Sequence, residues 1–261
     1  MKTHALVRPP GASFAQAISS TAAIIDVALA QAQHAEYRQA LAEAGVVVEL
    51  LPADERYPDG CFVEDTAVIV AGRAVICRPG AASRRGEEEA VAAFLAGRVP
   101  LARLVPPGTL EGGDVIVTPD RVLVGRSART NAAGIAQLAV ALADLTGLGD
   151  LSGLAPLPVH AVPVTGCLHL KTAATYIGHG TVLAVAAYAD HPAFAGLDVL
   201  VVPDEEAAAA DALGIGDAVI LPTGCPRVAA MLRARGFAVL PVPISEFAKA
   251  DGGVTCLSLV W

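Results

Sequence analysis

One pattern constrains this chain more than any other: a hairpin, a helix and a further strand, repeated with a period of about 50 residues. Three pairs of β-rich runs form the hairpins, which turn at residues 71–73, 118–120 and 178–180. Gly, Pro and Asp in these turns supply the backbone angles that a tight reversal requires. A repeated unit of this length indicates a radial or repeat architecture. A doubly wound sheet is the alternative, but no Gly-x-Gly-x-x-Gly follows a strand.

The hydrophobic spacing predicts where the individual elements lie. Strands are expected at 4–7, 46–51, 66–70, 74–77, 114–117, 121–124, 174–177, 181–185, 198–202, 218–221, 237–242 and 255–261. Helices are expected at 14–44, 86–96, 130–145, 205–213, 225–235 and 245–249. The segments 147–158 and 191–196 are expected to be surface loops, because strand patterns resume directly on either side. No linker divides the chain, so a single domain over residues 1–261 is predicted.

Composition excludes several classes of protein. Hydrophobic residues make up 54% of the chain and charged residues 17%, which indicates a compact fold. The formal charge is -8, and Lys and Arg are scattered, so we expect no nucleic-acid partner and favour a small, positively charged substrate. No apolar run approaches the ~18 residues of a membrane span, and the first residues lack the apolar core of a signal peptide. We therefore expect no membrane partner.

The cysteines are odd in number and share no repeated spacing: Cys61, Cys77, Cys167, Cys225 and Cys256. Neither a disulfide framework nor a zinc module is indicated by such a pattern. Reduced thiols in a cytoplasmic protein fit it best.

Carboxylates interrupt the apolar pattern at the heads of the first two hairpins. The stretch YPDGCFVEDT places Asp59, Glu64 and Asp65 before the first, and LEGGDV places Glu111 before the second. Acids at a strand entrance are usually solvated. In a radial fold, however, equivalent points converge on one axis, so these acids would build an anionic pocket.

Three arginines, Arg84, Arg85 and Arg129, precede predicted helices. Such residues are commonly surface charges, but a cation is poorly placed against the positive end of a helix dipole. That mismatch favours an anionic ligand nearby. The planar guanidinium fork clamps a carboxylate with two parallel hydrogen bonds.

Among the histidines, His169 occupies the head of the third hairpin, the place that carboxylates take in the first two. By contrast, His34, His179 and His191 are expected to be exposed. Cys167 and His169 give a C-x-H pattern, but without a second matching pair this is a weak metal signal. No metal site is therefore predicted.

Cys256 follows Gly252 and Gly253 and opens the last predicted strand. A lone cysteine is most often a small buried hydrophobe. A Cys and a His brought together from distant parts of a chain also form a nucleophile and an acid-base pair, provided that a positive neighbour favours the thiolate. The two glycines would let backbone approach a substrate beside the sulfur.

With these motifs assembled, the chain resembles the dimethylarginine dimethylaminohydrolase family, in the guanidine-modifying branch of the pentein superfamily. The resemblance spans the chain through THALVR, LPADERYPDGCFVEDTAVI, RPGAASRRGE, LEGGDVIVT, VGRSARTN, HLK and DGGVTCLS. It implies an α+β fold, a five-bladed propeller of ββαβ units around a central active site. It also implies a single catalytic domain.

By matching position, the resemblance implies that Cys256 is the nucleophile, His169 the general acid and base, and Glu111 their acidic partner. The expected reaction hydrolyses asymmetric dimethylarginine or monomethylarginine to citrulline and dimethylamine or methylamine. It would pass through a covalent S-alkylthiouronium intermediate on the cysteine. No metal or organic cofactor is implied.

The resemblance also assigns the substrate contacts. Asp65 would hold the guanidinium, supported by Glu64. Asp59 would take the α-ammonium, helped by backbone carbonyls near Ile18 and Ala250. Ala250 is smaller than the branched residue that the family pattern leads one to expect.

Arg84 and Arg129 would clamp the α-carboxylate, with Arg85 as the alternative if the register slips by one residue. The segment 8–18 resembles the family's mobile flap, in which Ile18 or Phe14 would close over the ligand.

Two other functions remain open at this point. A deiminase acting on free or otherwise substituted arginine is the nearest rival. A non-catalytic ribosome-binding pentein would lack the Cys and His pair and carry a basic surface, unlike this chain. A monomer or a homodimer is equally compatible with the sequence.

Overall fold

The computed structural model describes residues 3–143 and 157–261. They divide into two compact units, the first built from residues 1–64 and 171–261 and the second from residues 65–170. No helix in the described ranges is long and apolar enough to cross a bilayer.

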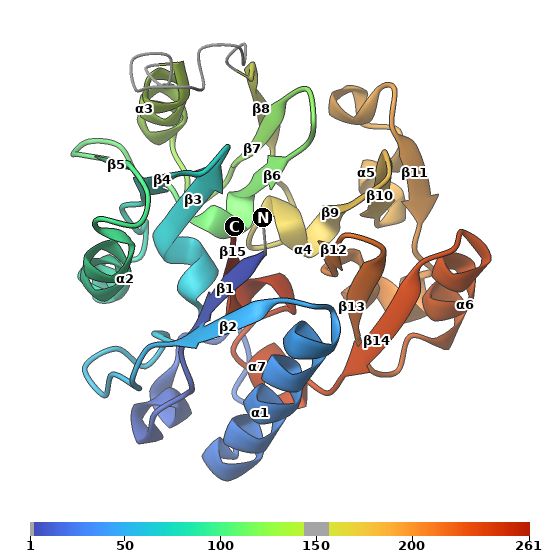
Figure 1. The fold of residues 1–261 in the computed structure, drawn as a ribbon, viewed down its shortest axis with the longest axis horizontal. Helices are drawn as coiled ribbons and strands as arrows, with labels where there is room; N and C mark the ends of the chain where they lie inside the picture. Colours follow the sequence, from blue (N-terminus) through green and yellow to red (C-terminus); the bar gives the residue numbers. More distant parts are fainter. Residues whose placement is uncertain (1–2, 144–156) are drawn as a thin grey trace. The chain divides into compact units, whose positions relative to one another are not determined.

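The first unit contains three three-stranded sheets (Figure 1). In spatial order their strands are β15 (Leu259–Val260), β1 (His4–Val7) and β2 (Val47–Leu50); β9 (Ala174–Gly178), β10 (Thr181–Ala184) and β11 (Asp198–Val201); β12 (Leu213–Ile215), β13 (Ala218–Pro222) and β14 (Ala238–Val242). The first of these sheets joins the two ends of the chain, because β15 pairs with β1.

The second unit contains two further three-stranded sheets. Their strands are β3 (Ala67–Val70), β4 (Arg73–Ile76) and β5 (Leu101–Arg103); β6 (Val115–Val117), β7 (Val122–Arg126) and β8 (Val159–Pro163).

All five sheets share one pairing pattern. In the described part of the chain, each middle strand pairs antiparallel with one neighbour and parallel with the strand after it, as β4 does with β3 and β5. The antiparallel neighbour is the preceding strand in four sheets, whereas in the first sheet it is β15, the last strand of the chain. The three expected hairpin turns are present, and the turn at Ala71 and Gly72 has positive φ angles of 50° and 76°. The repeat inferred from the sequence is therefore confirmed.

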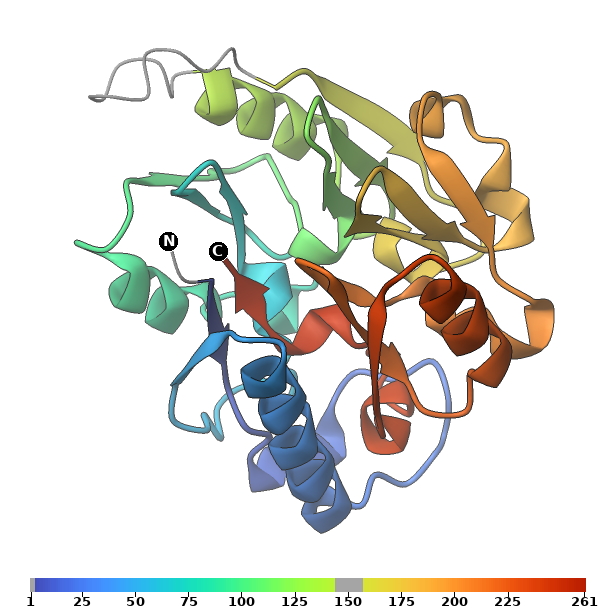
Figure 2. The same cartoon turned by 45° about the vertical axis from the view of Figure 1, so that its right-hand side comes forward.

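Helices connect the strands. The first unit carries α1 (Val27–Glu43), α5 (Ala186–Ala189), α6 (Pro226–Ala234) and α7 (Ser245–Ala248); the second carries α2 (Glu88–Leu95) and α3 (Ala132–Ala143). The short α4 (Leu170–Ala173) spans the boundary between the units. Within the first unit, α1 contacts β2 and α7 (Figure 2). Within the second, α2 packs on β3 and β4, and α3 on β7 and β8.

Apolar side chains on these contact faces form the core. One cluster of the first unit includes Phe14, Phe62, Phe247 and Cys256, and a second lies under α6. The second unit has its own cluster around β3, β4, β6 and β7. Burying a Leu or Phe side chain stabilises a fold by about 1.5–3 kcal/mol.

The long helix expected over 14–44 is wrong in its first half. A 3-10 helix covers Ala12–Gln16, residues 17–26 are not helical, and α1 begins at Val27. Asp26 explains this start, because its side chain accepts the Leu29 N–H as an N-cap.

Two other expected elements also differ. The helix expected over 205–213 is a 3-10 helix over Asp204–Ala210 that leads into β12. The strand expected over 255–261 begins as a 3-10 turn, Thr255–Leu257, and only Leu259–Val260 pair as β15. Strands β5, β8 and β12 were not expected from the sequence. The expected loop 147–158 lies mostly outside the described residues, and the one at 191–196 contains a 3-10 turn, Pro192–Phe194.

Candidate active site

The predicted site residues divide between the two units. The first unit holds Ile18, Asp59, Glu64, Ala250 and Cys256, and the second holds Asp65, Arg84, Glu111, Arg129 and His169. The pairing of Cys256 with His169 joins residues of different units and stays a prediction.

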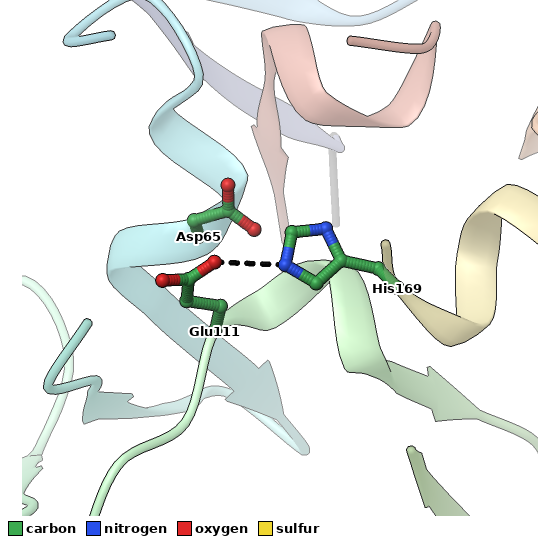
Figure 3. A group of neighbouring side chains, drawn as sticks. All are labelled: Asp65, Glu111 and His169. Carbon is green, nitrogen blue, oxygen red and sulfur yellow. Dashed lines mark hydrogen bonds and ion pairs between the residues drawn. The ribbon is translucent and has the colours of Figure 1, made fainter. Parts of the chain in front are cut away.

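Glu111 and His169 form the centre of the group in the second unit (Figure 3). The Glu111 Oε2 atom lies 2.8 Å from His169 Nε2, and these residues are 0% and 4% exposed. Burial alone would lower the pKa of His169, but Asp65, the hydrogen bond to Glu111 and the nearby Asp114 together raise it to about 9. The ring is therefore an imidazolium at neutral pH, ready to give a proton.

Glu111 is fixed from several sides. Its Oε1 atom accepts the Gly80 N–H at 3.0 Å and the Ala81 N–H at 3.3 Å, and Arg129 Nη1 lies 3.3 Å from Oε2. Burial would raise the pKa of Glu111, but its bond to His169 and the surrounding guanidinium charges lower it to about 2. The carboxylate thus stays ionised and orients the imidazole ring.

Arg84 is buried between two carboxylates. Its Nη1 atom lies 2.6 Å from Asp65 Oδ2, its Nη2 atom lies 2.8 Å from Glu87 Oε2, and the residue is 3% exposed. Asp65 Oδ1 also accepts the Gly113 N–H at 3.0 Å. Arg85 is exposed, and its Nε–H donates to the Pro79 carbonyl. Sequence reasoning had no signal for Glu87 as a partner of Arg84.

Asp65, Glu111 and His169 each offer one ligand atom, all within 4.8 Å of one another. The chemistry of the set does not favour a metal, because an imidazolium is no ligand and the carboxylates already pair with Arg84 and Arg129. Cys167, the other half of the weak C-x-H signal, directs its thiol to the His169 carbonyl oxygen at 3.3 Å. We therefore interpret the group as an ion-pair cluster.

In the first unit, Cys256 lies in the 3-10 turn that leads into β15 and is 8% exposed. The Gly253 N–H donates to the Cys256 Sγ atom at 3.4 Å. A Cβ atom on Gly252 would lie 2.4 Å from the Phe62 ring, and one on Gly253 would lie 2.0 Å from Asp211 Oδ2. Both glycines are therefore required by close packing around residues 252–257. We call this segment the nucleophile turn, after the role that the sequence predicts for Cys256.

Glu64 connects this turn to a partly buried lysine. Its Oε2 atom accepts the Thr255 hydroxyl at 2.8 Å, and its Oε1 atom lies 2.5 Å from Lys171 Nζ. Burial would lower the pKa of Lys171, but Glu64, Asp211 and Cys256 raise it, which keeps a cation beside the nucleophile turn. Lys171 stood within the motif HLK, although sequence reasoning gave it no role.

Asp211 is a second acid beside the same turn. Its Oδ1 atom accepts the Thr255 N–H at 2.9 Å. Burial and the neighbouring Glu64 raise the pKa of Asp211 to about 7. Sequence reasoning missed Asp211, because it fell inside an alanine-rich stretch expected to be helical.

One predicted flap residue, Ile18, contacts Asp59, whose Oδ1 atom accepts the Ile18 N–H at 3.1 Å. Ile18 is half-buried, whereas Phe14 is fully buried against the rings of Phe62 and Phe247. Ala250 is also buried.

The expectation that His34 is exposed is wrong. His34 is 1% exposed, and neither ring nitrogen has a hydrogen-bond partner in the described part of the chain. Burial, with a contribution from Arg38, lowers its pKa to about 3. His179 is exposed as expected, and His191 is half-buried.

A family model described as "N,N dimethylarginine dimethylhydrolase, eukaryotic" matches residues 12–213. The N(G),N(G)-dimethylarginine dimethylaminohydrolase of Pseudomonas aeruginosa is 39% identical over 99% of both chains. The one from Streptomyces coelicolor is 38% identical over 98% of this chain and 95% of its own.

Solved structures agree with these relatives. A dimethylarginine dimethylaminohydrolase captured as an adduct with S-methyl-L-thiocitrulline matches with a TM-score of 0.93 and 36% identity over 100% of both chains. A mutant of the Pseudomonas aeruginosa enzyme complexed with citrulline gives the same values. Together with the five three-stranded sheets, this match confirms the pentein fold. The chain therefore belongs to the dimethylarginine dimethylaminohydrolase family.

Proposed function

We propose that this chain is an amidine hydrolase that converts N-omega-methylated arginines to citrulline and the corresponding methylamine. The observation that carries the proposal is the buried Glu111–His169 pair, whose imidazolium is held by hydrogen bonding and charge. In the other unit, the Cys256 thiol accepts a backbone N–H and lies near the partly buried cation of Lys171. Family membership supports the same chemistry.

In the proposed reaction, the Cys256 thiolate attacks the central carbon of the guanidinium. The new C–S bond gives a neutral tetrahedral adduct. His169 then gives its proton to the dimethylamino nitrogen, the C–N bond breaks, and dimethylamine leaves. An S-alkylthiouronium cation remains on the cysteine.

Water completes the proposed cycle. The neutral His169 takes one proton from a water molecule while the water oxygen bonds to the thiouronium carbon. The C–S bond then breaks, which releases citrulline and restores the thiolate. The second proton of the water ends on the released amine as dimethylammonium, so atoms and charges balance.

The remaining site residues are proposed to position the substrate. Asp65, supported by Glu64, would face the guanidinium, and Asp59 would take the α-ammonium together with carbonyls near Ile18 and Ala250. A cation held against fixed carboxylates presents its carbon to the nucleophile in one orientation, which is worth several kcal/mol of the barrier.

Arg129 keeps part of its surface and is proposed to bind the α-carboxylate. Arg84 stays a prediction for the same role. Its guanidinium lies between Asp65 and Glu87, so a substrate carboxylate reaches it only when one of these partners gives way.

The two units are proposed to act as one catalytic domain over residues 1–261, as a monomer or homodimer. The spacing of the five cysteines does not indicate a disulfide framework, which supports a reducing, cytoplasmic setting.

The test is citrulline release from separate incubations with asymmetric dimethylarginine, monomethylarginine, symmetric dimethylarginine and arginine. Release from the first two, abolished by Cys256→Ser, is the expected result. Release chiefly from arginine would make the protein a deiminase. Full activity in the Cys256→Ser variant would refute the proposal that Cys256 is the nucleophile.

A further inference from the structure

Asp211 contacts the nucleophile turn on both sides of its centre. Its Oδ1 atom accepts the N–H of Thr255, the residue before Cys256. A Cβ atom added to Gly253 would lie only 2.0 Å from the Asp211 Oδ2 atom, so the Gly253 backbone packs directly against the carboxylate. Residues on both sides of the turn therefore contact the same buried side chain, that of Asp211.

Gly253 links Asp211 to the Cys256 sulfur, because its backbone contacts both. The Gly253 N–H donates to Cys256 Sγ, so a displacement of Gly253 or Thr255 would move the donor, the sulfur or both. In a reaction that needs atoms aligned within a fraction of an ångström, a shift of about 1 Å lowers the rate by about a hundredfold.

Asp211 is itself anchored from the opposite direction. Thr175 Oγ1 donates to the Ala210 carbonyl at 2.7 Å and accepts the Ala212 N–H at 3.3 Å. The backbone on both sides of Asp211 is thus tied to β9, a strand of a neighbouring sheet in the same unit.

The second unit contains a matching arrangement. Asp114, fully buried before β6, accepts the N–H of Leu170, the residue after His169, at 2.9 Å. Its other oxygen accepts the Ser127 hydroxyl at 2.6 Å. A buried aspartate before the first strand of a sheet therefore holds the backbone next to a predicted catalytic residue in each unit.

From these contacts we propose that Asp211 is a positioning residue for Cys256: its carboxylate holds Thr255 and Gly253 so that the thiol keeps its place in the nucleophile turn. The inference rests on the proposed function only in treating Cys256 as the nucleophile. Asp211 acts through the backbone and touches no reacting atom.

The test compares Asp211→Ala, Asp211→Asn and a matched control, Glu206→Ala. Glu206 is also buried in the first unit, and it accepts the N–H groups of Arg227 and Val228 at the start of α6. Glu206→Ala therefore removes a buried carboxylate that, like Asp211, accepts backbone N–H groups, but that does so at α6 and not at the nucleophile turn. Each variant is measured by amide hydrogen exchange of the peptide 251–261, and by kcat and KM.

Asp211→Ala is expected to speed exchange of the Thr255 amide about tenfold or more and to lower kcat by about ten- to a hundredfold, with KM within about threefold. Asp211→Asn keeps an oxygen that accepts the N–H, so both quantities should return to within about threefold of the wild type. Glu206→Ala should alter exchange only near α6 and leave kcat within about twofold.

An Asp211→Ala protein with wild-type kcat would overturn the proposal, as would an Asp211→Asn protein that fails as badly as the alanine variant. If Asp211→Ala does not fold, Gly253→Ala decides, because its Cβ would push the turn from the carboxylate. A wild-type kcat in that variant also refutes the proposal. Hydrogen exchange needs no substrate, so it tests Asp211 even if no methylarginine is hydrolysed.

Discussion

The buried His34 makes the stability of this protein sensitive to mild acid. Its folded pKa is about 3, while an ordinary histidine titrates near 6.5. Burial is the main cause, because the charged ring would lose its hydration without gaining a hydrogen bond from the described residues. A proton therefore binds the unfolded chain more tightly than the folded one. The stabilising effect of the neutral ring is present above pH 6.5 and is lost progressively as the pH falls towards 3.

The size of this effect at pH 5 follows directly from the two pKa values. At that pH an unfolded histidine is almost fully protonated, whereas His34 in the folded chain is almost fully neutral. The difference lowers the free energy of unfolding by about 2 kcal/mol relative to pH 7.5.

Urea unfolding at pH 7.5 and pH 5 measures this effect in the wild type and in His34→Leu. Other titrating groups contribute to both proteins and cancel in the comparison. We expect the free energy of unfolding to fall by about 2 kcal/mol more in the wild type than in His34→Leu when the pH is lowered from 7.5 to 5. The exposed His179→Leu variant serves as the control and should behave as the wild type. Equal losses in the wild type and His34→Leu would refute the reasoning.

Three further predictions concern the second unit. Glu111→Gln removes the negative charge beside His169, so the His169 pKa should fall below about 9 in an NMR titration; an unchanged pKa would contradict this. Arg84→Met leaves Asp65 buried without its cation, so urea unfolding should show that the free energy of unfolding falls by about 3–5 kcal/mol. A fall of less than about 1 kcal/mol would contradict a stabilising role for this ion pair. Gly113→Ala would place a Cβ 2.7 Å from His169 Nδ1, so kcat should fall about tenfold while circular dichroism stays unchanged; a wild-type kcat argues against this packing.

The repeat and most strands were predictable, because they depend on local patterns. Hairpin turns such as Ala71–Gly72 need particular backbone angles, and buried strands need runs of branched side chains, both visible in a short window. The edge strands β5 and β12 were missed because each has only three residues, too few for a periodic signal.

The missing parts of the candidate site depend on contacts between distant residues. The partners of Thr255 are Glu64 and Asp211, which lie 191 and 44 residues away in sequence. The burial of His34 likewise depends on packing against Phe247. Neither contact leaves a local pattern. The sequence therefore predicted several acids and a thiol as site residues, but it gave no signal for Asp211 or for the contacts that hold Thr255.

The proposed reaction requires that Cys256 bonds covalently to the guanidinium carbon. S-methyl-L-thiocitrulline tests it directly, because its methanethiol group departs without a proton from histidine. We would incubate the His169→Gly variant with this compound and search every cysteine peptide for an adduct by mass spectrometry. We expect an S-alkylthiouronium adduct on Cys256, absent when Cys256→Ser is added and retained when Cys167→Ser is added. No adduct, or one on another cysteine, would contradict it.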